Sequence, residues 1–246
     1  EVHNNSTLTN LTVTNSRFAE SSSGIRIRGN LSTTQISGTA FENNGIGFHT
    51  TQGQDATEAP DPSDITSATE VTIESSTFTG NTNKSIYAEK LSDSVFDDIS
   101  VTGGEIDINL KYHDYSNITI KNSTIEDVTT GTGMYVKARN DRSGDIDYNT
   151  VPASLSGLAI TGNTITGNNA GSGIALQHGI QDATIVENLI QENGNEFTRN
   201  GRFIISGLSI YGSQDADQSG PDVNLKDLQI TDNCIVNNAA HDLLVG

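Results

Sequence analysis

Short segments in which apolar and polar residues alternate recur along the whole chain. Each segment passes through a small polar step and closes on an apolar residue, and SVFDDISV (94–101) fits this pattern loosely. An alternation with a period of two is typical of a β-strand with one buried face. The seven clearest segments are LTVTNSRF (11–18), TQISGTAF (34–41), EVTIESSTF (70–78), NITIKNSTI (117–125), GLAITGNTI (157–165), DATIVENLI (182–190) and DLQITDNCI (227–235).

The spacing of these segments indicates a solenoid. Successive closing residues are separated by 23, 37, 23, 24, 40, 25 and 45 positions, so the base period is 23 to 25 residues. The longer gaps contain turn-rich text at 52–64, 139–154, 193–203 and 212–222, which predicts inserted loops. The repeat favours an all-β, right-handed parallel β-helix of about eight coils, forming one domain over residues 1–246. The closing residues are Phe18, Phe41, Phe78, Val101, Ile125, Ile165, Ile190 and Ile235.

A column of small polar residues lies two positions before the closing residues. Stacked at the strand spacing of about 4.8 Å, such side chains can form a hydrogen-bonded ladder. We therefore expect this column to be structural. It consists of Ser16, Thr39, Ser76, Ser123, Asn163, Asn188 and Asn233.

Composition narrows the range of partners. The net charge of −18 argues against binding to nucleic acid or to anionic membranes, and no apolar run approaches the length of a membrane span. A hydrophobic content of 33% and the absence of Trp suit a thin, repeated core. The acidity is typical of a secreted protein. Because the chain begins at a coil and ends inside one, we expect a module of a larger protein.

The coils resemble those of the right-handed parallel β-helix superfamily of pectate lyases and related polysaccharide enzymes, over essentially the whole chain. Within it, GSGIALQHGIQDATIVENLIQENG (171–194) looks most like the coils of mannuronan C5-epimerase modules, a family that uses Ca²⁺ and acts on alginate. The resemblance implies a saccharide bound on the strand face that precedes the insertions. It also implies a possible Ca²⁺ cofactor.

A second set of strands, from GIRIRG (24–29) to GLSIYG (207–212), carries the candidate chemistry. Their outward residues should form two files, about 4.8 Å apart along each file and roughly 30 Å long over seven coils. Five of the 13 basic residues fall on or beside this face, which indicates an anionic or polyhydroxyl ligand. The first file reads Arg26, Gly47, Tyr87, Asp107, Tyr135, Ala175 and Ser209, and the second reads Arg28, His49, Glu89, Asn109, Lys137, Gln177 and Tyr211.

Three kinds of activity remain open for this face. Uronate elimination or C5-epimerisation needs a neutralised carboxylate, a base and an acid. Its catalytic candidates are Lys111, Lys137, Tyr135, Asp107, Arg139 and His113, and its substrate-binding candidates are Arg26, Arg28, His49, Tyr87, Glu89, Asn109, Gln177 and Tyr211.

Glu89 and Asp107 enter two further hypotheses. Together they could hold Ca²⁺, or they could act as the carboxylate pair of a glycoside hydrolase. The last alternative is a noncatalytic module that binds glycans or builds a surface, adhesin or phage spike, because Tyr and Arg suit polyols without doing chemistry. The sequence favours an extracellular module that acts on an acidic polysaccharide as a lyase or epimerase, and leaves its oligomeric state open.

Overall fold

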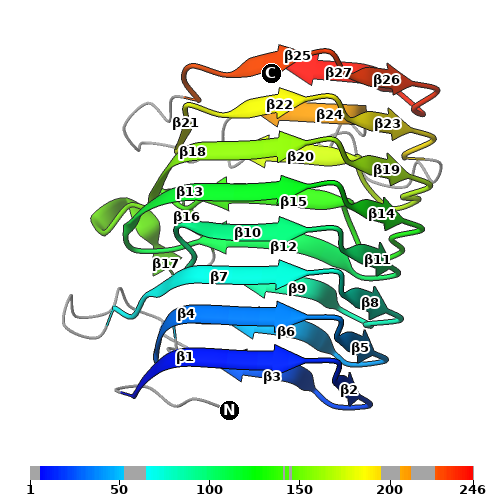
Figure 1. Ribbon diagram of the computed structural model, residues 1–246. Helices are drawn as coiled ribbons and strands as arrows, with labels where there is room; N and C mark the ends of the chain where they lie inside the picture. The colour runs from blue at the N-terminus through cyan, green and yellow to red at the C-terminus, as the bar shows by residue number, and fades with distance from the viewer. Residues whose placement is uncertain are drawn as a thin grey trace.

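The chain folds as a stack of eight coils in which three parallel sheets run along the stack (Figure 1). The computed structural model describes residues 6–52, 65–140, 142–143, 146–194, 206–211 and 225–245. In Figure 1 the coils rise from the first (blue) to the last (red). The predicted parallel β-helix is confirmed.

The long sheet, which faces the viewer in Figure 1, takes the first strand of every coil. Its strands are β1 (Thr7–Thr14), β4 (Asn30–Ser37), β7 (Ala68–Glu74), β10 (Ser94–Asp97), β13 (Asp114–Lys121), β18 (Ser154–Thr161), β22 (Thr184–Val186) and β25 (Gln229–Thr231), and β21 (Ile180–Gln181) pairs with β18.

The short sheet takes the second strand of every coil. Its strands are β2 (Arg17–Ala19), β5 (Ala40–Glu42), β8 (Thr77–Thr79), β11 (Ser100–Thr102), β14 (Thr124–Glu126), β19 (Thr164–Thr166), β23 (Leu189–Gln191) and β26 (Cys234–Val236).

The third strand of every coil belongs to the polar sheet, which lies behind the long sheet in Figure 1. Its strands are β3 (Ser23–Ile27), β6 (Ile46–Thr50), β9 (Lys84–Ala88), β12 (Glu105–Leu110), β15 (Met134–Ala138), β20 (Ile174–Gln177), β24 (Ser206–Tyr211) and β27 (His241–Val245).

All eight closing residues predicted from the sequence form one column of the short sheet. Inside the first three coils the column is an aromatic stack. The ring centroids of Phe18 and Phe41 are 5.4 Å apart, and those of Phe41 and Phe78 are 4.6 Å apart with an interplanar angle of 4°. Stacking equivalent side chains fills a narrow interior at high density, which explains how so little apolar sequence supports the fold.

A repeated bend separates the long and short sheets. The residue at this bend has a positive φ in every coil, which favours Gly and Asn because they reach the left-handed region at low cost. The residue that follows the bend belongs to the predicted polar column, and the predicted hydrogen-bonded ladder of this column is confirmed. Ser123 N donates to Asn163 Oδ1 (3.0 Å), Asn163 N donates to Asn188 Oδ1 (3.0 Å), and Asn188 N donates to Asn233 Oδ1 (2.9 Å).

A second asparagine ladder, which was not predicted, lies five residues further along each coil. Asn168 N donates to Asn193 Oδ1 (3.3 Å), and Asn193 N donates to Asn238 Oδ1 (3.1 Å). Both ladders satisfy backbone groups that would otherwise be buried without partners at the turns.

The predicted insertions are described only in part. Of the insertions predicted at 52–64, 193–203 and 212–222, residues 53–64, 195–203 and 212–222 lie outside the described residues. Within the insertion at 139–154, β16 (Arg142–Ser143) pairs antiparallel with β17 (Ile146–Asp147), and a 3₁₀ turn η2 (Tyr148–Thr150) follows. Among the described residues, no helix is both long and apolar enough to span a membrane.

Candidate functional site

The outward side chains of the polar sheet form two parallel rows along the stack. Strand register joins the second row from Asn109 through Tyr211, whose side chain lies outside the described part. Glu89 follows the end of β9 and is joined to the next coil by a hydrogen bond from Lys111 N to its backbone oxygen (3.0 Å). The first row is Arg26, His49, Tyr87, Asp107, Tyr135, Ala175 and Ser209, and the second is Glu89, Asn109, Lys137, Gln177 and Tyr211.

The second coil was misplaced in both predicted files. His49 lies in the first row, paired with Arg26 and Tyr87, whereas the sequence alignment placed Gly47 there and put His49 beside Arg28. The error is a slip of two residues. Such a slip keeps every side chain on its correct face, so the apolar pattern could not reveal it.

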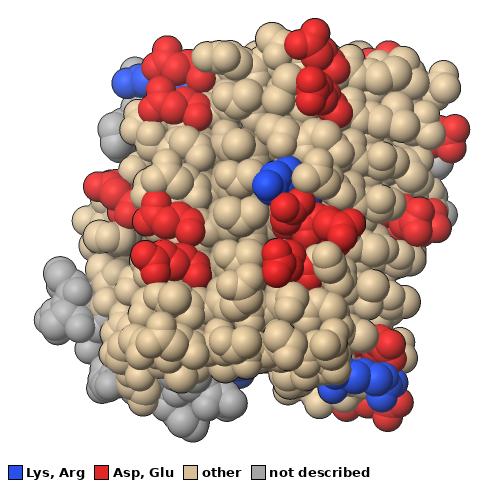
Figure 2. Space-filling view, viewed as in Figure 1, with Lys and Arg blue, Asp and Glu red and all other residues tan. Residues whose placement is uncertain are grey.

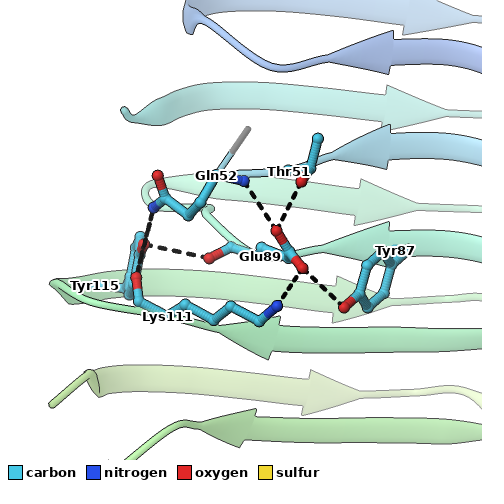
Figure 3. Close-up of polar contacts among 6 residues, drawn as sticks. All are labelled: Thr51, Gln52, Tyr87, Glu89, Lys111 and Tyr115. Carbon is cyan, nitrogen blue, oxygen red and sulfur yellow. Dashed lines mark hydrogen bonds and ion pairs between the residues drawn. The ribbon is translucent and has the colours of Figure 1, made fainter. Parts of the chain in front are cut away.

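Glu89 is the most heavily contacted carboxylate of the rows (Figure 3). Its Oε2 accepts hydrogen bonds from Thr51 Oγ1 (2.7 Å) and from the backbone N of Gln52 (2.9 Å). Its Oε1 accepts one from Tyr87 Oη (3.0 Å) and forms an ion pair with Lys111 Nζ. Both oxygens of Glu89 are therefore fully engaged by donors of the protein.

These contacts determine the charge of Glu89. Desolvation by burial raises the pKa of this carboxyl, but the Lys111 ammonium and the hydrogen bonds from Thr51 and Gln52 outweigh it and hold the pKa below its ordinary value. The phenol of Tyr87 responds in the opposite direction, because burial and the neighbouring Glu89 and Asp107 charges raise its pKa. Tyr87 therefore keeps its proton at neutral pH, and Glu89 stays ionised beside Lys111.

Asp107, one coil further on, has a different environment. Its Oδ2 forms an ion pair with Lys84 Nζ (2.9 Å), and the same ammonium forms an ion pair with Glu105 Oε1. Glu105 Oε2 in turn accepts a hydrogen bond from Thr132 N (2.8 Å). Burial raises the pKa of Asp107 above its ordinary value, although the charge of Lys84 works against the shift.

The two carboxylates do not assemble a calcium shell. Ca²⁺ takes six to eight oxygen ligands, whereas Glu89 is engaged by four donors and Asp107 Oδ2 by an ammonium. No cluster of three His, Cys, Asp or Glu side chains suited to a metal occurs among the described residues. The donor set does not fit Ca²⁺, and the predicted calcium requirement stays a prediction.

Tyr135 and Lys137 continue the rows beyond Asp107. The Lys137 ammonium lies 5.5 Å from the centroid of the Tyr135 ring, and the Tyr135 hydroxyl is hydrogen-bonded to Gln177 Oε1. The register places Tyr135 directly beside Asp107. A phenol, a carboxylate and an ammonium from two neighbouring coils thus meet at the centre of the face.

Lys111 and Arg139 follow directly after β12 and β15, as predicted. Tyr148, from the insertion, packs between them. Its ring centroid is 4.2 Å from Arg139 Cζ, 6.0 Å from Lys111 Nζ and 5.3 Å from the ring of Tyr112. These cation–π contacts hold two basic side chains at one edge of the polar sheet.

His113 is less closely joined to the other candidate catalytic residues than the sequence indicated. It is exposed, and its ring meets Tyr115 edge-on with centroids 5.7 Å apart. Tyr115 contacts the site through backbone oxygens, because its hydroxyl donates to Lys111 O (2.7 Å) and Glu89 O (3.2 Å).

His49 is buried and its ring lies 5.2 Å from that of Tyr87. Burial lowers the pKa of His49 to about 4; Glu89 opposes this shift, and the charges of Arg26, Arg28 and Lys111 add to it. The imidazole is therefore neutral at neutral pH.

Acidification is expected to destabilise the protein through His49. Between pH 6.5 and pH 4 the unfolded chain gains a proton that folded His49 does not, so the free energy of unfolding falls by up to about 3 kcal/mol as the pH decreases. In the variant His49→Gln, the free energy of unfolding should no longer show this part of its dependence on pH. Urea unfolding at several pH values measures it, with exposed His113→Gln as the matched control. Equal slopes for wild type and His49→Gln would contradict the assignment.

Several contacting residues were not predicted. A register shift between Glu105 and Ile106 brings Lys84 opposite Glu105, and this bulge concealed Lys84 from a period-two reading. Glu105 could have been predicted from the sequence, because it lies two positions before Asp107 on the same strand and should face the same side. Thr51 and Gln52 stand at the base of a predicted insertion, where sequence gives no direction to a side chain.

Lys90 is a further unpredicted residue and is completely buried. Its Nζ donates to the backbone oxygens of Arg28 and Gly29 (2.6 Å each) and to Thr66 Oγ1. Burial lowers the pKa of Lys90 to about 7, against the opposing charge of Glu89. The ammonium joins the end of β3 to the segment that returns from the insertion at 53–64.

Charge is distributed unevenly around the stack. Figure 2 shows that the side viewed in Figure 1, mainly the long sheet, carries several acidic clusters and few basic side chains. On the polar sheet and its edge, six of the 13 basic residues are gathered. They are Arg26, Arg28, Lys84, Lys111, Lys137 and Arg139.

The stacked coils and their polar sheet define a right-handed parallel β-helix protein. The family model described as right handed beta helix region matches residues 2–158, more than half of the chain. The chain belongs to this family. The search of curated proteins found no match.

Proposed function

We propose that this protein is an extracellular enzyme that acts on an acidic polysaccharide, by uronate β-elimination or C5-epimerisation, on the polar sheet. The single observation that carries the proposal is the gathering of six basic side chains on and beside one sheet of a chain whose net charge is −18. A local cationic face on an acidic protein attracts an anionic ligand and orients it.

The chemistry begins with the substrate carboxylate. Lys111 forms an ion pair with Glu89, and its ammonium and the Arg139 guanidinium both contact the Tyr148 ring, so these two cations would neutralise the carboxylate and make the adjacent C5 proton more acidic. Tyr135 is the candidate that accepts this proton, as a phenolate formed after its hydroxyl, now hydrogen-bonded to Gln177 Oε1, has released its own proton to solvent; the Lys137 ammonium lies 5.5 Å from the centroid of its ring. Tyr87 keeps its own proton because its pKa is raised, and its hydroxyl already donates to Glu89, so it suits hydrogen bonding to the substrate rather than proton transfer.

Glycoside hydrolysis is a second candidate, favoured by one observation. The pKa of Asp107 is raised and that of Glu89 is lowered, a divergence typical of an acid and base pair. Against it, both oxygens of Glu89 already accept hydrogen bonds or an ion pair, so this carboxylate has no lone pair directed at a water. A noncatalytic glycan-binding or structural module is the remaining alternative.

The test is incubation with a panel of polyuronates, with and without Ca²⁺. Growth of ultraviolet absorbance from unsaturated uronates establishes elimination, and reducing ends without absorbance favour hydrolysis. Exchange of the C5 proton with deuterated solvent, without chain cleavage, establishes epimerisation. Binding without any of these products would leave a glycan-binding module, and no binding would refute the proposal.

Tyr148 should affect the affinity for a polyuronate through its ring. The variant Tyr148→Leu is expected to bind about three- to tenfold more weakly, because the cation–π contacts with Arg139 and Lys111 are lost. Tyr148→Phe keeps the ring and should retain most of the affinity. Isothermal titration calorimetry on the two variants, with melting temperatures as the control, separates this effect from simple packing. Equal losses in both variants would argue against it.

A further inference from the structure

Two acceptor oxygens at the centre of the polar face receive no hydrogen bond from the part of the chain that the structure describes. Among the described residues, neither Asp107 Oδ1 nor Asn109 Oδ1 has a hydrogen-bond partner, although both atoms are shielded from solvent. Asp107 is only 5% exposed. Leaving a buried acceptor unsatisfied is costly, so such groups in folded proteins generally receive a water, an ion or a ligand.

The neighbouring side chains do not supply the missing donors. Tyr87 and Tyr135 flank Asp107 in the first row, but the Tyr87 hydroxyl donates to Glu89 and the Tyr135 hydroxyl is bonded to Gln177. The Lys84 ammonium contacts the other oxygen of Asp107. Both free acceptors belong to alternate residues of β12, so they face the same side of the sheet.

The surrounding charge selects the kind of ligand. Lys84, Lys111 and Lys137 are all close enough to act on Asp107 through their charges, which disfavours a further cation. An anion would be repelled by the two acceptor oxygens, which carry full or partial negative charge. A neutral group that donates hydrogen bonds avoids both penalties, and sugar hydroxyls are such donors.

We propose that Asp107 and Asn109 form a subsite that receives the ring hydroxyls of one sugar residue. This inference rests on the proposed function, in which Lys111 and Lys137 lie beside the carboxylate of the same substrate. The sugar ring would reach Asp107 Oδ1 and Asn109 Oδ1 by displacing the ends of the surrounding side chains. Lysine ends are flexible, and the uronate carboxylate attracts them.

The test is calorimetric binding of three matched oligosaccharides. The first is an oligouronate, the second is the same oligomer with its ring hydroxyls O-acetylated, and the third has its carboxyl groups reduced to alcohols. O-acetylation removes the donors and keeps the charge. Wild type should therefore bind the first at least about tenfold more tightly than the second.

Variants assign this preference to the two residues. Asn109→Ala and Asp107→Asn should each reduce the preference for free hydroxyls, while Asn83→Ala, an exposed asparagine before β9, should retain it. Equal affinity of wild type for the first two oligomers, or an unchanged preference in both variants, would overturn the subsite and leave the proposed function standing. Binding of the reduced oligomer alone, lost in Asn109→Ala, would support the subsite and refute the uronate substrate. Binding of none of the three overturns both.

Discussion

Replacing Lys111 with methionine is expected to lower kcat/KM for a polyuronate by about 100-fold or more, because a fixed charge aimed at the substrate carboxylate is removed. Methionine keeps much of the length and volume of the lysine stem. Glu89 would also lose its ion pair and keep a buried negative charge that repels the substrate. Initial rates with the substrate identified in the panel measure the effect, and affinity replaces rate if the protein only binds.

A matched lysine on the opposite side of the stack provides the control. Lys121 lies on the long sheet, pairs with Asp97 (3.1 Å) and has a side chain that is 39% exposed. Lys121→Met should change kcat/KM by less than about twofold, since exposed ion pairs contribute little. Unchanged turnover in a correctly folded Lys111→Met protein would remove Lys111 from the catalytic group.

Replacing Glu89 with leucine should lower the free energy of unfolding by about 3–5 kcal/mol, the cost of removing one member of a buried ion pair. Lys111 loses its carboxylate, and the donors of Thr51, Gln52 and Tyr87 lose their acceptor. Denaturant unfolding measures the change. The double variant Glu89→Leu/Lys111→Met should recover part of the loss, because it no longer buries an unpaired charge.

The control for this variant is Glu42→Leu. Glu42 pairs with Arg17 at 2.7 Å, but the two side chains are 35% and 59% exposed, so the loss should stay below about 1 kcal/mol. Similar losses for Glu89→Leu and Glu42→Leu would show that the buried contacts of Glu89 do not contribute as the geometry indicates.

The fold could be predicted because each coil repeats the same requirements. An inward residue and a polar bend recur 23 to 25 positions apart wherever no insertion intervenes, and this repeat predicted the column from Phe18 to Ile235. The same regularity failed at His49, where a slip of two residues leaves the alternation intact. The outward rows were therefore correct in side but not everywhere in register.

The site was harder to predict than the fold because its contacts depend on the ends of long side chains. Asp107, Tyr135 and Lys137 were found from alternation, since a strand position decides their direction. Lys84 was concealed by a bulge, and the side chain of Tyr148 reaches the site from an insertion without repeat. Nothing in the repeat specifies either contact.

The position of the site along the stack has a consequence for local opening. Strands β9, β12 and β15 belong to the third, fourth and fifth of eight coils, and each coil pairs only with its neighbours. A linear array of this kind frays from its two ends, so the middle opens last. Amide hydrogen exchange should therefore slow from both termini towards β12, and the residues of the proposed substrate site would stay in place while the outer coils open locally.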